Sequence, residues 1–372
     1  MKLGISAWRL YGQRLGIGRY IEYMLKHWNK MLEPTDRVTL FVHEPLDKNY
    51  LNLSDAFSVQ VIKPKLTNAL WENLLLPKYA KGQDVLFGPS YTVPLLYGGR
   101  SVVVIHSVDE LQNGSHSVWH RFTYEQKYKL SVHKADKVIA NSQSTRERVA
   151  KRYGISEDKI EPIWLGVDEA FRPIKDEDLL RSTRMRYLGA DRPYILFVGG
   201  LSRRRNIPTL MTAFSILKNR EKIPHSLLLV GPNRARIPLE KLAKELGIAG
   251  SFVQTDGLFK EHRELASIYN AADIFVLPSS SEGFSLTLPE AMSCGTPVIT
   301  VNCSTLAEIA NGYGFMIEEP SVEALTKAMY KVLDDSELRK NLSAKCLERA
   351  RSFRWEITAR RTLEVLRNVA QT

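Results

Sequence analysis

The sequence PYILFVGGLSRRRNIPTL, residues 193–210, passes from a short apolar run through paired glycines into a pattern typical of a helix. A fully apolar run of this length, bounded by glycine, indicates a strand that is buried on both faces of a sheet. The same change from apolar run to helical pattern recurs along the chain. We therefore predict an α/β fold built on two doubly wound parallel sheets.

The predicted strands form two series, separated by a charged stretch that contains proline. In chain order they are KLGISAW, RVTLFVH, VQVIK, DVLFG, SVVVIHS, KVIANS and KIEPIWLG, then PYILFVGG, SLLLVG, SFVQTDG, DIFVLPS, PVITVN and GFMIEE. We expect one Rossmann-like domain over residues 1–172, a linker over 173–190, a second domain over 191–354 and a final helix over 355–372. Residues 176–178, DED, match a D-x-D metal pattern, but without partner ligands we interpret them as a solvated acidic cluster.

Composition restricts the function without fixing it. The chain has 372 residues, 44% of them hydrophobic and 25% charged, which is typical of globular domains. Its net charge is +11, and the positive excess is larger in residues 1–175 than in 176–372. A basic surface favours phosphate-bearing partners or an anionic membrane, although a basic protein that is merely soluble is equally open.

Cysteine usage and hydropathy predict a cytoplasmic protein. The three cysteines, Cys294, Cys303 and Cys346, lack C-x-x-C spacing, which fits a reducing compartment. The first residues are too polar for a signal peptide, and no apolar run has the length of a transmembrane helix. Any membrane contact should then be peripheral. Residues 114–130 mix aromatic and basic side chains, and they fit either such a contact, an anionic acceptor or an ordinary amphipathic helix.

Two glycine-containing transitions from strand to helix are candidate phosphate sites, because ligands of open α/β sheets bind beyond the carboxyl ends of the strands. In LGIGRY, Gly16 and Gly18 allow a close approach of the backbone, but Ile21 replaces the third glycine of the dinucleotide fingerprint, which disfavours a dehydrogenase. In residues 203–205, three arginines precede a helix, and arginine binds phosphate with a bidentate fork. A plain glycine turn and a solvated basic turn are the alternatives.

Three further transitions complete the set. Gly231 in LVGPNR, and Gly257 and Leu258 in QTDGLF, either offer backbone groups to a nucleotide base or form ordinary turns. In SSSEGFSLTLPEA, Glu282 and Glu290 bracket a helix that should begin near residues 285–287. A carboxylate accepts hydrogen bonds from vicinal hydroxyls, so these two acids suit the two sugar rings of a nucleotide diphosphate sugar. Glu290 is also explained by a capping box with Thr287.

The stretch EGFSLTLPEA, followed by GTPVI, resembles the E-x7-E signature of the retaining glycosyltransferases of family 4, glycosyl transferases group 1. GIGRYIEYM, VIHSVDE, ANSQSTRERV, GVDEAFRP, FVGGLSRRRN and YNAADIFVLPS resemble the same family. The resemblance implies the GT-B fold, in which two Rossmann-like domains face each other across a cleft. It also implies that the first domain binds the acceptor, that the second binds the nucleotide sugar, and that the final helix crosses back to the first domain.

The resemblance further implies roles for single residues. Glu282 would hold the transferred sugar, Glu290 the ribose and Arg205 the diphosphate, while His106 would line the sugar site. The implied catalytic residues are Glu282, His106 and Arg205, and the implied donor-binding residues are Gly16, Gly18, Gly200, Arg204, Arg205, Gly231, Gly257, Leu258, Glu282, Gly283, Phe284, Ser285, Leu286 and Glu290. Gly200 departs from the family, because many members have a second arginine there. Either Arg203 or Arg204 compensates, or the chain belongs to a subset with a small residue.

The function implied is transfer of a sugar from an NDP-sugar to a hydroxyl, with retention, by a hexosyltransferase. Mannose, rhamnose and glucose are the expected sugars, and the expected acceptor is a glycan or a lipid-linked glycan of a bacterial surface polysaccharide. No metal, other cofactor or nucleic acid is expected, since arginines and a helix dipole can neutralise the diphosphate. Two alternatives stay open: an NDP-sugar epimerase of the same fold, and a non-catalytic protein that binds nucleotide sugars.

Overall fold

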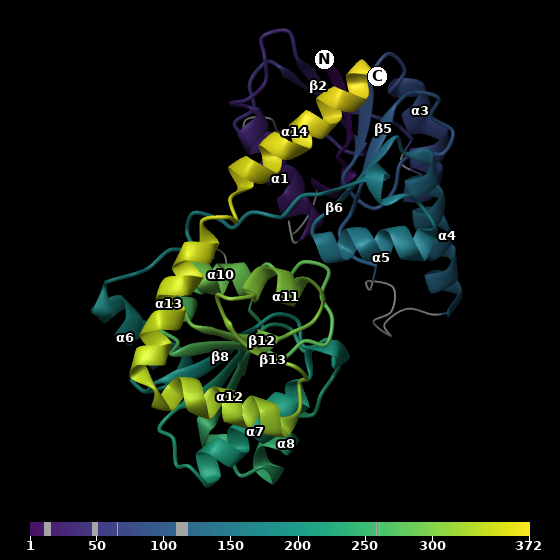
Figure 1. Ribbon diagram of the computed structural model, residues 1–372. Coiled ribbons are helices and arrows are strands. Elements are labelled where there is room, and N and C mark those ends of the chain that lie inside the picture. Colours follow the sequence, from purple (N-terminus) through teal and green to yellow (C-terminus); the bar gives the residue numbers. More distant parts are fainter. Residues whose placement is uncertain (11–15, 47–50, 65, 109–117, 258, 260) are drawn as a thin grey trace. The chain divides into compact units, whose positions relative to one another are not determined.

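The structure, a computed structural model, describes residues 1–372 except 11–15, 47–50, 65, 109–117, 258 and 260 (Figure 1). The chain forms two compact units. The first comprises Met1–Gly166 and Arg354–Thr372, and the second comprises Val167–Phe353. No helix among the described residues is both long enough and apolar enough to cross a membrane.

The first unit is built on a parallel sheet of seven strands in the order β3-β2-β1-β4-β5-β6-β7. Its strands are β1 (Lys2–Ser6), β2 (Arg37–Val42), β3 (Phe57–Val61), β4 (Val85–Gly88), β5 (Ser101–Ile105), β6 (Lys137–Ala140) and β7 (Ile160–Pro162). Each corresponds to one predicted apolar run. Every residue of β4 and β5 is buried, as expected for central strands that are covered on both faces.

Helices and helical turns connect these strands. They are η1 (Trp8–Leu10), α1 (Ile17–Trp28), α2 (Asn68–Leu70), the π-helical η2 (Trp71–Leu75), α3 (Leu76–Tyr79), α4 (Val118–Lys134), α5 (Gln143–Tyr153), η4 (Glu157–Lys159) and α14 (Trp355–Gln371). Local sequence sets their ends. In α5 the Ser142 side chain accepts a hydrogen bond from the Thr145 N–H, and Gly154 ends the helix in the left-handed conformation.

The C-terminal helix α14 belongs to the first unit, where it lies along α1 (Figure 1). The indole N–H of Trp28 donates to the carbonyl of Ala359 at 2.8 Å, and the rings of Tyr23 and Trp355 stack with centroids 4.6 Å apart. Gly166 passes so close to Trp355 that a Cβ there would lie 2.1 Å from the Trp355 nitrogen. Aromatic packing and a glycine therefore fix the place of α14 within this unit.

The second unit contains a parallel sheet of six strands in the order β10-β9-β8-β11-β12-β13. They are β8 (Tyr194–Val198), β9 (Ser226–Val230), β10 (Phe252–Thr255), β11 (Ile274–Leu277), β12 (Val298–Val301) and β13 (Phe315–Ile317), and all six were predicted. This is the doubly wound order in which the direction of winding reverses between β8 and β11, the first and fourth strands of this sheet in chain order. The carboxyl ends of β8 and β11 therefore mark the expected ligand crevice.

Helices cover both faces of this sheet. They are α6 (Glu177–Leu188), η5 (Arg203–Arg205), α7 (Ile207–Asn219), α8 (Leu239–Glu245), η6 (Ala249–Ser251), α9 (His262–Asn270), α10 (Thr287–Ser293), α11 (Ser304–Ala310), α12 (Val322–Asp334) and α13 (Ser336–Ala350). α7 packs against α12 on one face, and α10 packs against α13 on the other (Figure 1).

The prediction of a linker over residues 173–190 was wrong. The chain enters the second unit at Val167, and most of the predicted linker is helix α6, which packs on α9. The Asp176 side chain, part of the DED pattern, caps α6 by accepting from the Leu179 N–H at 3.0 Å. Charged residues dominate this stretch because much of α6 faces solvent, so its hydrophobic pattern is weak.

Candidate active site

The two loops at the switch point of the second sheet are joined to each other. The backbone N–H of Ser280, after β11, donates to the carbonyl of Arg204, after β8, at 2.9 Å. The Asn206 side chain donates to the carbonyl of Pro278, also at 2.9 Å. These bonds hold the arginine turn and the loop that carries Glu282 side by side at the carboxyl edge of the sheet.

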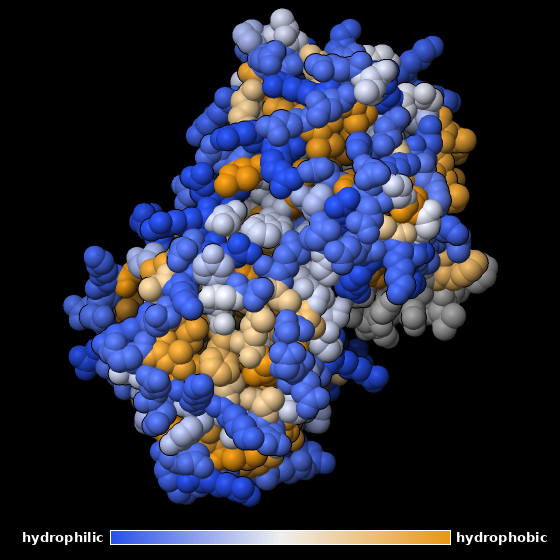
Figure 2. Space-filling view, viewed as in Figure 1, coloured by the Kyte–Doolittle hydropathy of each residue, from blue (hydrophilic) through white to orange (hydrophobic). Residues whose placement is uncertain are grey.

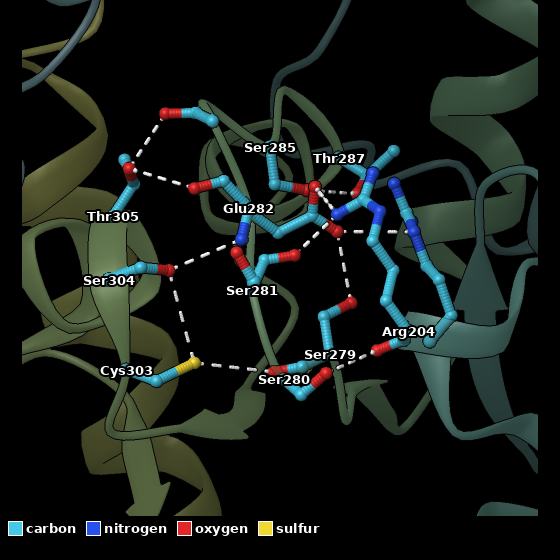
Figure 3. Close-up of polar contacts among 12 residues, drawn as sticks. Arg204, Ser279, Ser280, Ser281, Glu282, Ser285, Thr287, Cys303, Ser304 and Thr305 are labelled. Atoms are coloured by element: carbon cyan, nitrogen blue, oxygen red, sulfur yellow. Dashed lines mark hydrogen bonds and ion pairs between the residues drawn. The ribbon is translucent and has the colours of Figure 1, made fainter. Parts of the chain in front are cut away.

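Glu282 is buried between two arginines, with a relative exposure of 3%. Its Oε2 pairs with Arg204, and its Oε1 lies 3.1 Å from Nε of Arg205 and accepts from the Ser279 hydroxyl at 3.0 Å. Figure 3 shows the carboxylate at the centre of this network. Burying a carboxylate is costly unless it is paired, and two guanidinium groups supply the pairing here.

The backbone around Glu282 is fixed from the opposite side by the start of α11 (Figure 3). The Glu282 N–H donates to the Ser304 hydroxyl at 3.2 Å, and the Thr305 hydroxyl donates to the carbonyl of Gly283 at 2.7 Å. Arg204 also donates to the carbonyl of Ser281. The loop is therefore held on both sides, which positions its carboxylate before any ligand arrives.

Arg205 folds back against the end of β8. Its Nη1 donates to the carbonyl of Val198 at 3.4 Å, and a Cβ on Gly199 would lie 2.2 Å from the same Nη1. Burial lowers the pKa of the Arg205 guanidinium, and the positive charges of Arg204 and Arg234 lower it further against the opposing effect of Glu282. Gly199, with φ of 137°, thus makes room for a crowded guanidinium, a role that was not predicted.

Glycines bring three loops at this edge into close contact. A Cβ on Gly231 would lie 2.2 Å from the carbonyl oxygen of Gly199, and one on Gly257 would lie 3.2 Å from the Gly231 nitrogen. Both glycines also have positive φ values, 143° and 67°. The packing of one loop on another explains these glycines without a ligand, so their predicted role in donor binding stays a prediction. Leu258 lies outside the described residues.

Gly200 lies beside an arginine that sequence reasoning missed. A Cβ at Gly200 would lie 3.4 Å from Cδ and Nε of Arg234, in the loop after β9. Of the two arginines expected to compensate for Gly200, Arg204 is engaged by Glu282 and Ser281, and Arg203 is exposed. The available signal was Arg234 itself, a cation directly after a glycine turn at the carboxyl end of a predicted strand.

Glu290 lies in the first turn of α10, which begins at Thr287 as expected. The capping-box alternative was wrong, because Leu286 is the N-cap and no side chain caps this helix. The Glu290 carboxylate is buried, with Oε2 accepting from the Tyr269 hydroxyl at 3.2 Å. Burial and the adjacent negative charge hold the pKa of Tyr269 well above its usual value, so this hydroxyl stays a donor.

Three predicted residues, His106, Gly16 and Gly18, lie in the first unit. His106 follows β5, and its Nε2 lies 2.9 Å from the carbonyl oxygen of Pro89, so this nitrogen carries the proton. Its ring meets that of Tyr20, in the first turns of α1, edge to face at 5.2 Å. Gly16 has φ of 56° and precedes α1 directly. The structure therefore gathers these three residues around the start of α1.

Comparison with families of known proteins gives two matches that follow one another along the chain. The family described as Glycosyltransferase Family 4 matches residues 15–171, and Glycosyl transferases group 1 matches residues 186–349. Together they include the glycine turn before α1 and both switch-point loops of the second sheet.

The curated relatives are 25–30% identical to this chain over the aligned residues. The O-antigen chain mannosyltransferase B of Escherichia coli is 25% identical over 280 residues, 75% of this chain and 73% of its own length. A D-inositol 3-phosphate glycosyltransferase of Corynebacterium glutamicum is 30% identical over 236 residues, 61% of this chain. The matched region spans 56% of the length of that second relative.

Solved structures show the same fold over nearly the whole chain. HepE of Anabaena, solved in complex with UDP, has a TM-score of 0.77 at 16% identity, with coverage of 99% of this chain and 100% of its own. The glycosyltransferase WaaG, involved in lipopolysaccharide biosynthesis, has a TM-score of 0.74 at 17% identity, with coverage of 98% and 99%. With its two parallel-sheet units and its two family matches, the chain belongs to the group 1 glycosyltransferases of the family 4 type, which have the GT-B fold.

Proposed function

We propose that this glycosyltransferase is a retaining hexosyltransferase that uses an NDP-sugar donor. The observation that carries the proposal is the contact of Glu282 with Arg204 and Arg205 at the switch point of the second sheet. A carboxylate suits sugar hydroxyls, and a guanidinium suits phosphate. In an NDP-sugar the hydroxylated ring is bonded directly to a phosphate, so neighbouring groups of the ligand would meet neighbouring groups of the protein.

In this proposal, donor binding changes the partners of both Arg205 and Glu282. A phosphate oxygen replaces the carboxylate beside Arg205, and Glu282 then accepts hydrogen bonds from sugar hydroxyls. As the bond between the anomeric carbon and the phosphate oxygen breaks, negative charge grows on the diphosphate, where Arg205 stabilises it. The acceptor hydroxyl attacks the anomeric carbon from the same face and gives its proton to the departing phosphate oxygen, so the configuration is retained.

Glu290 is proposed to bind the ribose. It lies in the first turn of α10, the helix that follows the Glu282 loop, and Tyr269 already donates to one of its carboxylate oxygens. The other oxygen is directed toward the ribose hydroxyls in this proposal. The structural neighbour HepE was solved with UDP and with UDP-glucose, which supports a nucleotide sugar as the donor here.

The sugar and the acceptor are proposed from the curated relatives. Mannosyltransferase B and the serotype-specific mannosyltransferase WbdA of Escherichia coli make mannose the first sugar to test, with rhamnose and glucose next. The name of the first relative, an O-antigen enzyme, favours a glycan acceptor, free or lipid-linked, in bacterial surface polysaccharide synthesis.

A peripheral contact with an anionic membrane is also proposed, on the first unit. On α4, Phe122, Gln126, Lys129 and Leu130 are exposed and recur at helical spacing, so they share one face. Phe122 is 56% exposed and Leu130 is 50% exposed, and Leu96 is 67% exposed. Figure 2 shows hydrophobic atoms among hydrophilic ones along the edge of this unit that carries α3 and α4.

A transfer assay tests the proposed function. Purified protein is incubated with GDP-mannose, dTDP-rhamnose, UDP-glucose and UDP-galactose, each with and without a panel of lipid-linked and free glycan acceptors. We expect one donor to be consumed only with acceptor, with the anomeric configuration of that donor kept in the product by NMR, and with full activity in excess EDTA. Conversion of a donor without acceptor would identify an epimerase, and binding without turnover would identify a non-catalytic protein.

A further inference from the structure

The side chain of Arg234 is held over the backbone of Gly200. The Leu201 N–H donates to the Pro232 carbonyl, and the Ala235 N–H donates to the Leu201 carbonyl, both at 2.9 Å. These two bonds on either side of Arg234 fix the loop after β9 beside the loop after β8. The Arg234 side chain then lies 3.4 Å, at Cδ and at Nε, from the Cβ position of Gly200.

Arg234 differs from Arg204 and Arg205 because its side chain has no charged partner in the described part of the chain. Arg204 pairs with Glu282 and donates to Ser281, and Arg205 pairs with Glu282 and donates to Val198. Arg234 is exposed, and its side chain makes no ion pair or hydrogen bond with any residue in the described part of the chain. It is therefore the arginine of this group that can bind a ligand without first releasing a carboxylate.

The charges of the group favour an anion at this point. The guanidinium groups of Arg204 and Arg205 share one carboxylate, Glu282, which leaves a surplus of positive charge, and Arg234 adds to that surplus. The positive charge of Arg234 is felt at Arg205, whose pKa is lowered first by burial and also by Arg204 and Arg234. A phosphate between Arg205 and Arg234 would relieve this repulsion.

We propose that Arg234 binds the donor diphosphate together with Arg205, while Arg204 holds the Glu282 loop in place. The inference rests on the proposed function, since it concerns the same donor site. A guanidinium offers phosphate two parallel N–H donors, a geometry that lysine lacks. Arg234 would thus supply, from the loop after β9, the cation that Gly200 cannot supply from the loop after β8.

The position of Gly200 allows a direct test, in which the arginine is moved from position 234 to position 200. Its φ lies outside the left-handed region, and the three atoms nearest to a Cβ there all belong to the Arg234 side chain, at 3.4–3.8 Å. An arginine at position 200 is therefore sterically acceptable once Arg234 is shortened. In the double variant Gly200→Arg, Arg234→Ala, a guanidinium returns to the same place from the other loop.

The experiment is calorimetric titration of UDP, GDP and dTDP, and of the matching nucleosides, into the full-length protein and its variants. For the diphosphate that binds wild-type protein, Arg234→Ala should weaken binding by about tenfold to a hundredfold, as for loss of a charged hydrogen bond. Nucleoside binding should stay unchanged, because the nucleoside carries no phosphate. Gly200→Arg, Arg234→Ala should regain most of the lost diphosphate affinity. Arg236→Ala, which removes the same charge from the same loop, should bind like wild type.

Three results would overturn the proposal, and they differ in what they reject. Wild-type affinity for the diphosphate in Arg234→Ala would show that Arg234 takes no part, with the proposed function intact. An equal loss of nucleoside and diphosphate affinity would show a structural role only. If none of the three diphosphates binds wild-type protein, the proposed donor site fails together with this inference.

Discussion

Glu282 has two tasks at the residue scale. Its carboxylate neutralises two buried or half-buried guanidinium groups, and its backbone is part of the loop fixed by Ser304 and Thr305. A substitution therefore has to separate catalysis from folding. Glutamine keeps the oxygen that accepts from Ser279 and removes only the charge and one acceptor.

We predict that Glu282→Gln lowers kcat by at least about a hundredfold, a loss typical of removing one preorganised group from a transition-state site. Far-ultraviolet circular dichroism should remain that of wild type. Glu323→Gln, on the exposed face of α12, is the matched control and should transfer sugar normally. Transfer by Glu282→Gln at the rate of wild type would remove Glu282 from the mechanism.

Much of the site could be predicted from residue types, but the contact of Arg234 with Gly200 could not. Glu282, Glu290 and Arg205 follow strands whose order places their ends together, so their grouping in one unit follows from the α/β pattern. The contact of Arg234 with Gly200 depends instead on two loop hydrogen bonds and on the stacking of Gly199 and Gly231. Such loop geometry leaves no periodic trace in the sequence.

At the scale of elements, the strands were predictable and the connections were less so. All thirteen apolar runs became strands, because buried parallel strands need continuous apolar sequence. The sequence predicts a linker where the structure has helix α6, because the charged, half-exposed surface of α6 has a weak hydrophobic period. The π-helical turn η2 was not foreseen, and it buries an ionisable residue, Glu72, which accepts from the Thr92 hydroxyl at 2.8 Å.

Glu72 should make stability depend on pH. Burial raises its pKa from 4.5 to about 7, against weaker opposing effects of Thr92, Lys127 and Arg9. The folded protein thus holds a proton that the unfolded chain releases, so stability falls as pH rises from about 4.5 through 7. Above pH 7 the ionised form should cost on the order of 3 kcal/mol.

Denaturant unfolding of Glu72→Gln at pH 5 and pH 8 measures this effect. Glutamine cannot ionise, so the variant should gain stability relative to wild type as the pH is raised. Glu364→Gln, exposed on α14, should show a constant difference from wild type. A difference between Glu72→Gln and wild type that does not change with pH would contradict the assignment.

At the scale of the whole chain, the first unit is completed by the last residues of the sequence. α14 contributes buried Trp355, Leu363 and Leu366 to that unit, far from the other residues in sequence. The two segments of this unit are in close contact where Gly166 lies against the backbone of Trp355.

We predict that Gly166→Ala lowers the free energy of unfolding by about 1–3 kcal/mol. The methyl group of the alanine would overlap backbone atoms that cannot rotate away. Gly98→Ala is the matched control, because a Cβ at that exposed glycine meets no atom within 4 Å. Urea unfolding of both variants measures the difference. Equal stability of Gly166→Ala and wild type would contradict a tight backbone contact between Gly166 and Trp355.

Membrane contact is tested on the whole protein with vesicles. Phosphatidylglycerol vesicles should sediment more of the protein than phosphatidylcholine vesicles, and binding should weaken in high salt. Phe122→Ser together with Leu130→Ser should weaken binding, whereas Tyr330→Ser, an exposed aromatic residue of the second unit, should not. Equal binding to both lipids would reject the proposed anionic contact.

The central claim is that the second unit binds the diphosphate of an NDP-sugar, with Glu282 at the transferred sugar and Glu290 at the ribose. The most direct measurement is a crystal structure of the protein with the nucleoside diphosphate that binds it. We predict phosphate oxygens within hydrogen-bond distance of Arg205, and ribose hydroxyls within hydrogen-bond distance of Glu290. A nucleotide bound away from the ends of β8 and β11, or a ribose that does not reach Glu290, would contradict the claim.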